Sequence, residues 1–572
     1  MERMNKFDSR FWKRLSSLVK PYWFSDERRQ GIILLVAVLV LNGLTIALTA
    51  EFTYLNRDAS NALVAKRAHE LYVVLQRILL FLLAFVPVSA CEPWLRGRLT
   101  NVWREWMTRS FVEKGFAHRA FYQMIMGGTV DNPDQRISED IASFTENALL
   151  YLTILISAIV SAIVFSTILW SVSHLLAIAL FAYAGLGTWL SVAVGRRLVK
   201  INFDQQRYEA DFRFGLVHVR DNVEPIYMYG GQTAEISQLR RRFNDLFGNY
   251  NLLILWRRHL AFVTTPYGLL IQLLPIFLLA SLYFQGKIQY GQIVQSAVSF
   301  GYLQAALSVI VTNFNDLAGF ATVVNRLGTY VEECEAARAA ELEGGPRIET
   351  VEEDRVAFED VTVLTPGSRK PLLNRLSVDA SDLQPLLIKG RSGIGKTSLL
   401  RALAGLWQDG TGRITRPALG QVMFLPQRPY LILGTLRDQL CYPRANQTDD
   451  ATLREVLVEV NLADLAERFG GFDAELNWSD VLSPGEQQRL AFARLLLNRP
   501  GYAFLDEATS ALDGEDEERL YHRLRASGIR FISSGHRPTL LRYHRNLLEL
   551  SGPDLWKVSA SQEFQQTTAA AD

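Results

Sequence analysis

A glycine-rich segment near the middle of the chain has the residue types and spacing of a phosphate-binding loop. It reads G-x-x-x-x-G-K-T, follows the apolar stretch "LLIK" and precedes a helical pattern. Glycines allow backbone N–H groups to wrap around phosphates, and a helix N-terminus adds partial positive charge. The lysine would reach the β- and γ-phosphates, and the threonine would ligate Mg²⁺. The residues of this predicted site are Gly390, Arg391, Ser392, Gly393, Ile394, Gly395, Lys396, Thr397 and Ser398.

Two adjacent acids end a later apolar strand, in "GYAFLDEATSALD". Asp506 at the strand end can hold Mg²⁺, directly or through water, and Glu507 is placed to polarise an attacking water. A plain solvated strand end is the alternative. It does not explain why two acids close a buried-looking strand in a chain that also carries a phosphate loop.

Two further segments carry anion-binding residue types. "VLSPGEQQRLAFARLLL" offers Ser483 and Gly485 before a helix expected near Glu486, and "FISSGHR" is a strand that ends in His536. A hydroxyl, a backbone N–H and a helix N-terminus form an anion site. Because one nucleotide already fills its own phosphate loop, this second anion site implies a second chain.

With these motifs the chain resembles the ATP-binding cassette (ABC) transporter family over nearly all of its 572 residues. The resemblance implies that residues 390–397 are the Walker A loop, and that ATP and Mg²⁺ are the cofactors. The implied catalytic residues are Glu507, His536 and Gln427, the last in "FLPQRPY". The implied Mg²⁺ ligands are Thr397, Gln427 and the Walker B residue Asp506. The implied nucleotide contacts beyond the loop are Ser483, Gly485 and Glu486 of the signature motif and Asp513 of the D-loop.

The chain departs from the family pattern at two positions. The signature reads "LSPGE", in which Pro484 removes one N–H but has a φ that suits a helix start. Thr365 stands where the family has an aromatic residue that stacks on adenine. We therefore expect Ser483 and Gly485 to carry the signature contact, and adenine recognition to differ.

The first half of the chain contains apolar runs of membrane length. Each is about 20 residues, enough to cross ~30 Å of hydrocarbon as a helix. Buried helices of a soluble protein are the alternative, which so many runs in one half disfavour. The six predicted spans are 31–50, 71–92, 148–170, 172–194, 260–284 and 292–316.

Lysine and arginine are distributed unevenly between the segments that flank these spans. The segments 1–30, 93–147 and 195–259 hold 26 of them, against 4 in the opposite segments. Positive residues favour the cytoplasmic side. We expect an integral protein of a bacterial inner (plasma) membrane, with the N-terminus, nucleotide-binding domain and C-terminus in the cytoplasm. A net charge of +1 gives no support for nucleic acid as a partner.

The expected fold is an all-α six-helix transmembrane domain followed by an α/β P-loop NTPase domain. The predicted boundaries are a cytoplasmic segment 1–30, a transmembrane domain 31–335, a linker 336–350, a nucleotide-binding domain 351–557 and a polar tail 558–572.

The motif count indicates a half-transporter. One Walker A and one signature motif occur, and a composite site needs each from a different cassette. A two-fold homodimer in the lipid bilayer is the economical assembly, and a heterodimer is the alternative.

The chain resembles subfamily D, which includes peroxisomal acyl-CoA half-transporters and bacterial relatives linked to peptide or cobalamin uptake. The matching residues are "NPDQRISEDI" (132–141), "EADFRFGLVHVRDNVEPIYMYGG" (209–231) and "SSGHRPTLLRYH". The predicted function is ATP-driven transport by alternating access, with acyl-CoA or lipid, peptide or a cobalamin-like molecule as cargo. The alternatives are an ATP-gated channel or membrane sensor, and a soluble ABC ATPase, which the spans disfavour.

The segment "DNPDQRISED" (131–140) is polar although apolar runs flank it. It lacks the glycine and spacing of a calcium loop, so a solvated turn or a coupling element remains. The resemblance favours a coupling element that docks on the cassette. Pro133 would start a short helix capped by Asn132 or Asp131, and Asp134, Arg136 and Glu139 would offer charge.

Overall fold

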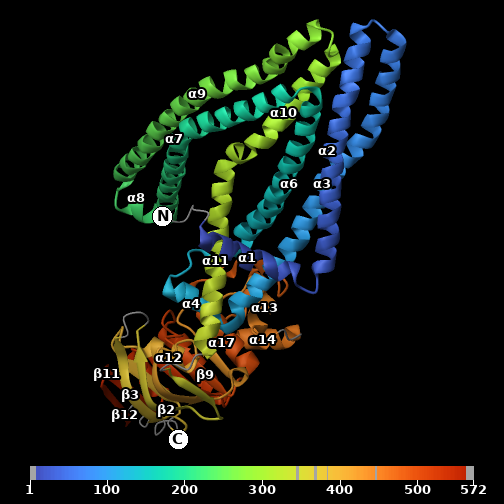
Figure 1. Cartoon of the computed structure of the whole chain (residues 1–572). Coiled ribbons are helices and arrows are strands. Elements are labelled where there is room, and N and C mark those ends of the chain that lie inside the picture. Colours follow the sequence, from blue (N-terminus) through green and yellow to red (C-terminus); the bar gives the residue numbers. More distant parts are fainter. Residues whose placement is uncertain (1–7, 343–346, 366–369, 383, 445–447, 562–572) are drawn as a thin grey trace. The chain divides into compact units, whose positions relative to one another are not determined.

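The structure of the chain is a computed structural model (Figure 1). It describes residues 8–342, 347–365, 370–382, 384–444 and 448–561, except for some side chains within the long helices. The chain divides into two compact units. We call Met1–Ala117 with Val130–Glu335 the helical unit, and His118–Thr129 with Ala336–Asp572 the α/β unit.

The regular elements described in the helical unit are all helical. They are α1 Ser9–Trp23, α2 Arg28–Val64, α3 Ala68–Phe116, α5 Pro133–Gln135 with a π-helical turn Arg136–Asp140, α6 Ile141–Val172, α7 His174–Asp221, α8 Val223–Met228, α9 Gln232–Phe284, α10 Tyr290–Thr312 and α11 Phe314–Leu342. Helix α2 packs on α3, α7 packs on α9, and α10 contacts α2, α6 and α9. Several helices, such as α3 and α9, are far longer than a membrane crossing needs.

Four helical stretches in the described residues are long and apolar enough to cross a membrane. They are Arg28–Val64, Ala68–Gly127, Pro133–Val172 and Gln232–Phe284. These stretches contain the predicted spans 31–50, 71–92, 148–170 and 260–284. The spans 172–194 and 292–316 fall largely within α7 and α10 and stay predictions.

The α/β unit combines short helices with two main sheets. Its helices are α4 Ala120–Gly127, α12 Lys396–Leu403, α13 Leu436–Cys441, α14 Asp450–Glu459, α15 Leu465–Arg468, α16 Trp478–Val481, α17 Pro484–Asn498 and α18 Gly514–Ala526, with 3₁₀ turns Ala117–Arg119, Leu419–Gln421 and Pro538–Arg542. Its strands are β1 Glu349–Glu352, β2 Ala357–Leu364, β3 Pro371–Asp379, β4 Leu386–Gly390, β5 Gly410–Arg416, β6 Val422–Leu425, β7 Gly434–Thr435, β8 Glu475–Leu476, β9 Tyr502–Asp506, β10 Arg530–Gly535, β11 Asn546–Gly552 and β12 Leu555–Ala560.

The larger sheet has the order β12-β11-β4-β10-β9-β6, and all its neighbours pair in parallel except β12 with β11. Strand β9 is buried on both faces. Its Tyr502 and Phe504 join one apolar core, whereas Ala503 and Leu505 join the other. Because successive side chains point to opposite faces, this apolar run fixes β9 as a central strand covered on both sides.

Two elements extend past predicted domain boundaries, which stay predictions. Helix α11 continues to Leu342, into the predicted linker 336–350, because its alanines and glutamates favour helix. Strand β12 pairs with β11 as far as Ala560, beyond the predicted domain end at 557. The predicted tail 558–572 otherwise lies almost wholly outside the described residues. Within the predicted segment 1–30, the structure has the helix α1, which the sequence analysis did not predict.

Candidate functional site: a nucleotide site at the edge of the parallel sheet

The predicted phosphate loop connects β4 to α12, so a strand, a glycine-rich loop and a helix start follow each other as expected. Gly393 and Gly395 have φ angles of 81° and 106°, in the region that disfavours a side chain. Lys396 is buried, and its Nζ donates to the carbonyl oxygens of Gly390 at 2.9 Å and Arg391 at 3.3 Å. The side chain of Lys396 therefore lies across the phosphate loop, where it contacts backbone carbonyls of that loop.

The carboxyl ends of neighbouring parallel strands bring the other predicted residues to this edge. Asp506 ends β9, and its Oδ1 accepts a hydrogen bond of 2.5 Å from Ser534 Oγ on β10. The next residue, Glu507, has a φ of 46°, and its N–H donates to the carbonyl of Ser534 at 3.1 Å. Open parallel sheets bind ligands outside the carboxyl ends of their strands.

The Glu507 carboxylate is the meeting point of three other predicted residues. Gln427 Nε2 donates to Glu507 Oε2 at 3.2 Å. Lys396 Nζ lies 3.8 Å from Glu507 Oε1, and His536 Nδ1 lies 3.6 Å from the same oxygen. His536 immediately follows β10 and is about two-thirds exposed. A carboxylate held among a lysine, an amide and an imidazole can accept or orient a proton.

The three predicted Mg²⁺ ligands line one cavity. A space of about 410 Å³ is bounded by Thr397, Gln427 and Asp506, with Phe424 and Phe504 among its apolar walls. A hydroxyl, an amide and a carboxylate supply oxygen donors, which Mg²⁺ prefers. In the part of the chain that the structure describes, no group of three or more His, Cys, Asp or Glu side chains could hold a metal. Such a donor-poor set fits Mg²⁺, which keeps waters and binds through one or two carboxylates with substrate phosphates.

The signature residues form a helix start of their own. Ser483 caps α17: its N–H donates to Glu486 Oε2 at 2.8 Å, and its Oγ accepts from the Glu486 N–H at 3.3 Å. Pro484 occupies the first turn, as expected. Arg468 Nη2 also donates to Glu486 Oε1 at 2.6 Å. Burial acts to raise the pKa of Glu486, but the bonds from Arg468 and Ser483 outweigh it, so this pKa lies below its usual range.

The signature residues and Asp513 do not line the cavity beside Asp506. The side chain of Asp513 instead caps α18, where its Oδ1 accepts from the Asp516 N–H at 2.8 Å. Within the described residues, the side-chain hydrogen bonds of Ser483 go to Glu486 and not to the phosphate loop. The chain therefore brings Lys396, Gln427 and Glu507 together, whereas Ser483 and Gly485 of the signature lie apart from them.

Two residues that the sequence analysis missed connect these segments. Gln488 on α17 is buried; its Nε2 donates to the Gln427 carbonyl at 3.2 Å, and its Oε1 accepts from the Ala511 N–H at 2.9 Å. Arg537, next to His536, donates to the carbonyl of Ser510 at 2.7 Å. Gln488 connects the loop of Gln427 to the segment that precedes Asp513, and Arg537 connects the residue after His536 to the same segment. No local motif marks such bridges.

At the predicted adenine position, Thr365 ends the described part of its loop. Its N–H donates to the Lys370 carbonyl at 2.8 Å, and its Oγ1 accepts from the Lys370 N–H at 2.9 Å. The threonine is therefore occupied by its hydrogen bonds with Lys370, and residues 366–369 lie outside the described part of the chain.

A segment of the first half belongs to the α/β unit. His118–Thr129, which contains α4, groups with Ala336–Asp572. Arg119 donates to the Gly405 carbonyl, and His118 contacts Glu341. A cavity of about 330 Å³ beside α4 is lined by Tyr122 and Trp407, among others. This is the segment between the membrane helices that packs on the nucleotide-binding fold.

The expectation that Arg136 offers its charge to the cassette is wrong, whereas docking of residues 131–140 through the exposed Asp134 and Glu139 stays a prediction. This segment belongs to the helical unit, and Arg136 is only 6% exposed. Its Nη1 donates to Asp140 Oδ2 at 3.1 Å, and Asp140 also pairs with Arg326. A buried charge needs a partner, so this arginine serves an internal ion pair. The predicted short helix does begin at Pro133, but Asn132 at its cap makes no capping bond with its side chain.

Two protein-family models match this chain. "ABC transporter transmembrane region 2" matches residues 16–284, and "ABC transporter" matches residues 373–510. Between them they cover most of both units.

Whole-length relatives agree with these matches. An uncharacterised ABC transporter ATP-binding protein of Synechocystis sp. is 42% identical, over 92% of this chain and 81% of that protein. The chloroplastic ABC transporter D family member 2 of Arabidopsis thaliana is 37% identical, over 95% of this chain and 86% of that protein. A solved bacterial Atm1-family ABC exporter with ATP bound shares the fold, with a TM-score of 0.72 at 18% identity, over 94% of this chain and 96% of that chain.

Proposed function

Because this chain belongs to the ABC transporter family, we propose that two copies of it form a homodimer with two composite ATP sites. The protein is an ATP-driven membrane transporter and an ATP hydrolase of the translocase type. The observation that carries the hydrolytic role is the Glu507 carboxylate, which meets Lys396, Gln427 and His536 at the edge of the parallel sheet.

In this proposal Glu507 orients and polarises the attacking water. Its backbone is fixed by the hydrogen bond to Ser534, which directs its carboxylate toward the phosphate loop. His536 would contact the γ-phosphate, and Gln427 would sense it through its bond with Glu507. Catalysis of phosphoryl transfer consists mainly of positioning and electrostatic stabilisation, which these fixed side chains provide.

The same residues fit Mg²⁺. Thr397, Gln427 and Asp506 would hold the ion, which would neutralise charge on the phosphates. Ser534 occupies Oδ1 of Asp506, so Oδ2 is the oxygen that remains for the ion or for a water bound to it. The glycine N–H groups of residues 390–395 and the start of α12 would bind the phosphates themselves.

The separation of the signature from the phosphate loop supports the dimer. Ser483 and Gly485 stand at the start of α17, outside the cavity that holds Thr397 and Asp506. A partner copy would bring its own signature to this loop. In the helical unit, α8 presents the exposed side chains of Met228 and, just after it, Tyr229, at 75% and 90% exposure. Such an apolar tip indicates a contact surface.

We further propose a bacterial inner membrane location with both termini on the cytoplasmic side, on the basis of the lysine and arginine distribution. The candidate cargo classes remain acyl-CoA or lipid, peptide and cobalamin-like molecules, in line with the similarity to a D family transporter. The complete set of hydrolytic residues favours turnover over a gated channel or sensor.

Mixed dimers test the composite site. Lys396→Ala and Ser483→Arg should each abolish hydrolysis in a homodimer, since each removes one side of both sites. Two differently tagged chains, one with each change, form a dimer with one site intact. Hydrolysis should return in this mixed dimer alone; an inactive mixed dimer would contradict composite sites.

The cargo is tested in proteoliposomes. Acyl-CoA, cobalamin and peptide would each be followed in both directions with ATP, and with Glu507→Gln as the control. Movement of one class that needs hydrolysis identifies cargo and direction together.

A further inference from the structure

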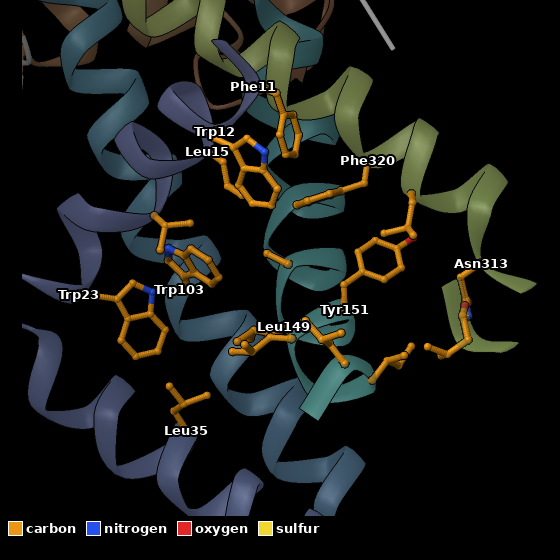
Figure 2. A pocket seen from close by; sticks show the side chains of 17 residues that line it. Phe11, Trp12, Leu15, Trp23, Leu35, Trp103, Leu149, Tyr151, Asn313 and Phe320 are labelled. Atoms are coloured by element: carbon orange, nitrogen blue, oxygen red, sulfur yellow. Dashed lines mark hydrogen bonds between the residues drawn. The ribbon is translucent and has the colours of Figure 1, made fainter. Parts of the chain in front are cut away.

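The helical unit contains an apolar cavity that the ATP cycle does not use. It measures about 700 Å³, within the ~300–1,000 Å³ of ordinary ligand sites. It lies between α1, α3, α6 and the region where α10 gives way to α11. Figure 2 shows Trp12 of α1, Trp103 of α3, Leu149 of α6 and Phe320 of α11 around the same space.

The walls suit a hydrocarbon chain. Aliphatic and aromatic side chains form nearly all of them, and the polar groups are those of Asn313, Tyr151 and the indoles. Leu152 and Leu155 of α6 line the cavity while remaining 39% and 50% exposed. The cavity therefore opens to the surface of the helical unit.

Helix α1 has the composition of a helix that lies in a membrane interface. Phe11, Leu15, Val19 and Trp23 recur at every fourth position and line the cavity. Exposed basic residues, among them Lys13 and Lys20, lie beside this apolar face, next to the edge that carries Trp23. An apolar face, a basic face and tryptophans near their border are typical of helices that bind anionic lipid surfaces.

One buried donor in the wall has no partner within the described residues. Trp103 is only 2% exposed, and its Nε1–H makes no hydrogen bond there. The ring of Tyr22 stacks on the ring of Trp103, with 5.9 Å between the two centroids. The Tyr22 hydroxyl is also buried and has no hydrogen-bond partner within the described residues. Buried donors are almost always satisfied, so an acceptor that enters with an apolar ligand would complete the site. The ester carbonyl of a lipid is such an acceptor.

We propose that this cavity binds one acyl chain of an anionic phospholipid from the leaflet in which α1 lies. Its headgroup is held by Lys13 and Lys20, and its ester oxygen accepts from Trp103. Charge favours an anionic lipid, because Lys13 and Lys20 are exposed cations and the neighbouring acid Glu332 is already paired with Arg14. The lipid anchors α1 against α3 and α6, and it is distinct from the transported cargo.

Retained lipid in the detergent-purified full chain tests this site by native mass spectrometry. Ala148→Trp fills the cavity and should lower retained phosphatidylglycerol by about fivefold. Ile159→Trp, an exposed position of the same helix α6 outside the cavity, is the matched control and should retain it fully. Equal retention in both variants would overturn the proposal.

The headgroup arm compares two lipids. Lys13→Gln combined with Lys20→Gln should weaken retention of phosphatidylglycerol and leave phosphatidylcholine unchanged, whereas exposed Lys66→Gln should change neither. Equal loss of both lipids would contradict the anionic headgroup site. Displacement of the bound lipid by acyl-CoA at a far lower concentration than by added phosphatidylglycerol would assign the cavity to cargo instead.

A third experiment tests the ester contact. It leaves the cavity volume nearly intact, so it tests the proposal even if Ala148→Trp fails to fold. Ester-linked phosphatidylglycerol should be retained better than its ether-linked analogue, which lacks the carbonyl acceptor. Trp103→Phe removes the N–H and should abolish that preference. A preference that survives in Trp103→Phe would remove the indole from the site.

Discussion

The two units bury opposite kinds of surface. In the α/β unit, Phe492 of α17 is fully buried, whereas in the helical unit Phe277 of α9 is 82% exposed. Polar groups in the helical unit instead pair between helices: Ser157 Oγ donates to Asn42 at 2.8 Å, and Gln295 donates to Thr53 at 3.4 Å. The difference follows from the solvent. In water, apolar side chains are buried in the core. In hydrocarbon, polar groups face one another between the helices.

The largest expected effect separates the two kinds of phenylalanine. Phe492→Ala should lower the free energy of unfolding of the α/β unit by about 3–5 kcal/mol, because a cavity replaces buried ring contacts. Phe277→Ala should change stability by less than about 0.5 kcal/mol, since lipid replaces the ring. Thermal unfolding in nanodiscs measures both. Similar losses would place Phe277 in a packed interface.

The second prediction concerns chemistry rather than packing. Glu507→Gln should lower ATP hydrolysis by about 10² or more and leave ATP binding intact, since the amide cannot polarise the attacking water. Glu515→Gln, an exposed change on α18, is the control. Steady-state hydrolysis and nucleotide affinity are the measurements. Undiminished turnover would remove Glu507 from its assigned role.

The third prediction tests a buried polar pair of the helical unit. Arg136→Ala should destabilise that unit by about 1–3 kcal/mol. The loss is smaller than for a buried charge left without any partner, because Arg326 still neutralises Asp140. Arg207→Ala breaks an exposed ion pair with Asp204 and should cost under about 1 kcal/mol. Unfolding midpoints compare the two. An uncoupled transporter of native stability would restore the docking role for Arg136.

The smallest expected effect is a pH dependence in the α/β unit. Burial lowers the pKa of His544 from 6.5 to about 4. Its Nδ1 lies 2.7 Å from the Leu540 carbonyl and its Nε2 lies 2.8 Å from Ser533 Oγ. Between these two pKa values the unfolded chain binds more protons than the folded one, so stability falls as the pH drops below 6.5 and levels off below 4.

The expected loss from His544 is about 1 kcal/mol at pH 5.5. Unfolding midpoints from pH 7.5 to 5 would measure it. The dependence should weaken in His544→Gln and persist in His522→Gln, which changes a mostly exposed histidine on α18. An unchanged slope in His544→Gln would show that other groups carry it.

The sequence predicted those parts of the site that short motifs define. Lys396, Asp506 and Glu507 each stand at a strand end or helix start, and the local pattern of apolar and glycine residues fixes those positions. Gln488 and Arg537 could not be predicted, because their hydrogen bonds depend on which loops the fold brings together.

The membrane helices were predicted from apolar length, but their partners were not. Polarity marked residues 131–140 as a segment outside the membrane, but tertiary packing decides that His118–Thr129, which no motif marked, is the segment that joins the α/β unit. Helix α1 was overlooked although its apolar residues recur at every fourth position, because the basic residues of the segment were read only as a topology signal.

The positive φ of Glu507 has an evolutionary consequence. A side chain in this backbone region costs on the order of 1 kcal/mol relative to glycine, and the hydrogen bond from its N–H to Ser534 helps to hold the residue there. A glycine at this position would relax the turn and leave the fold more stable, without a carboxylate. Selection for turnover alone keeps an acid at 507. The strained backbone at Glu507 is thus a stability cost that the role of its carboxylate in turnover offsets.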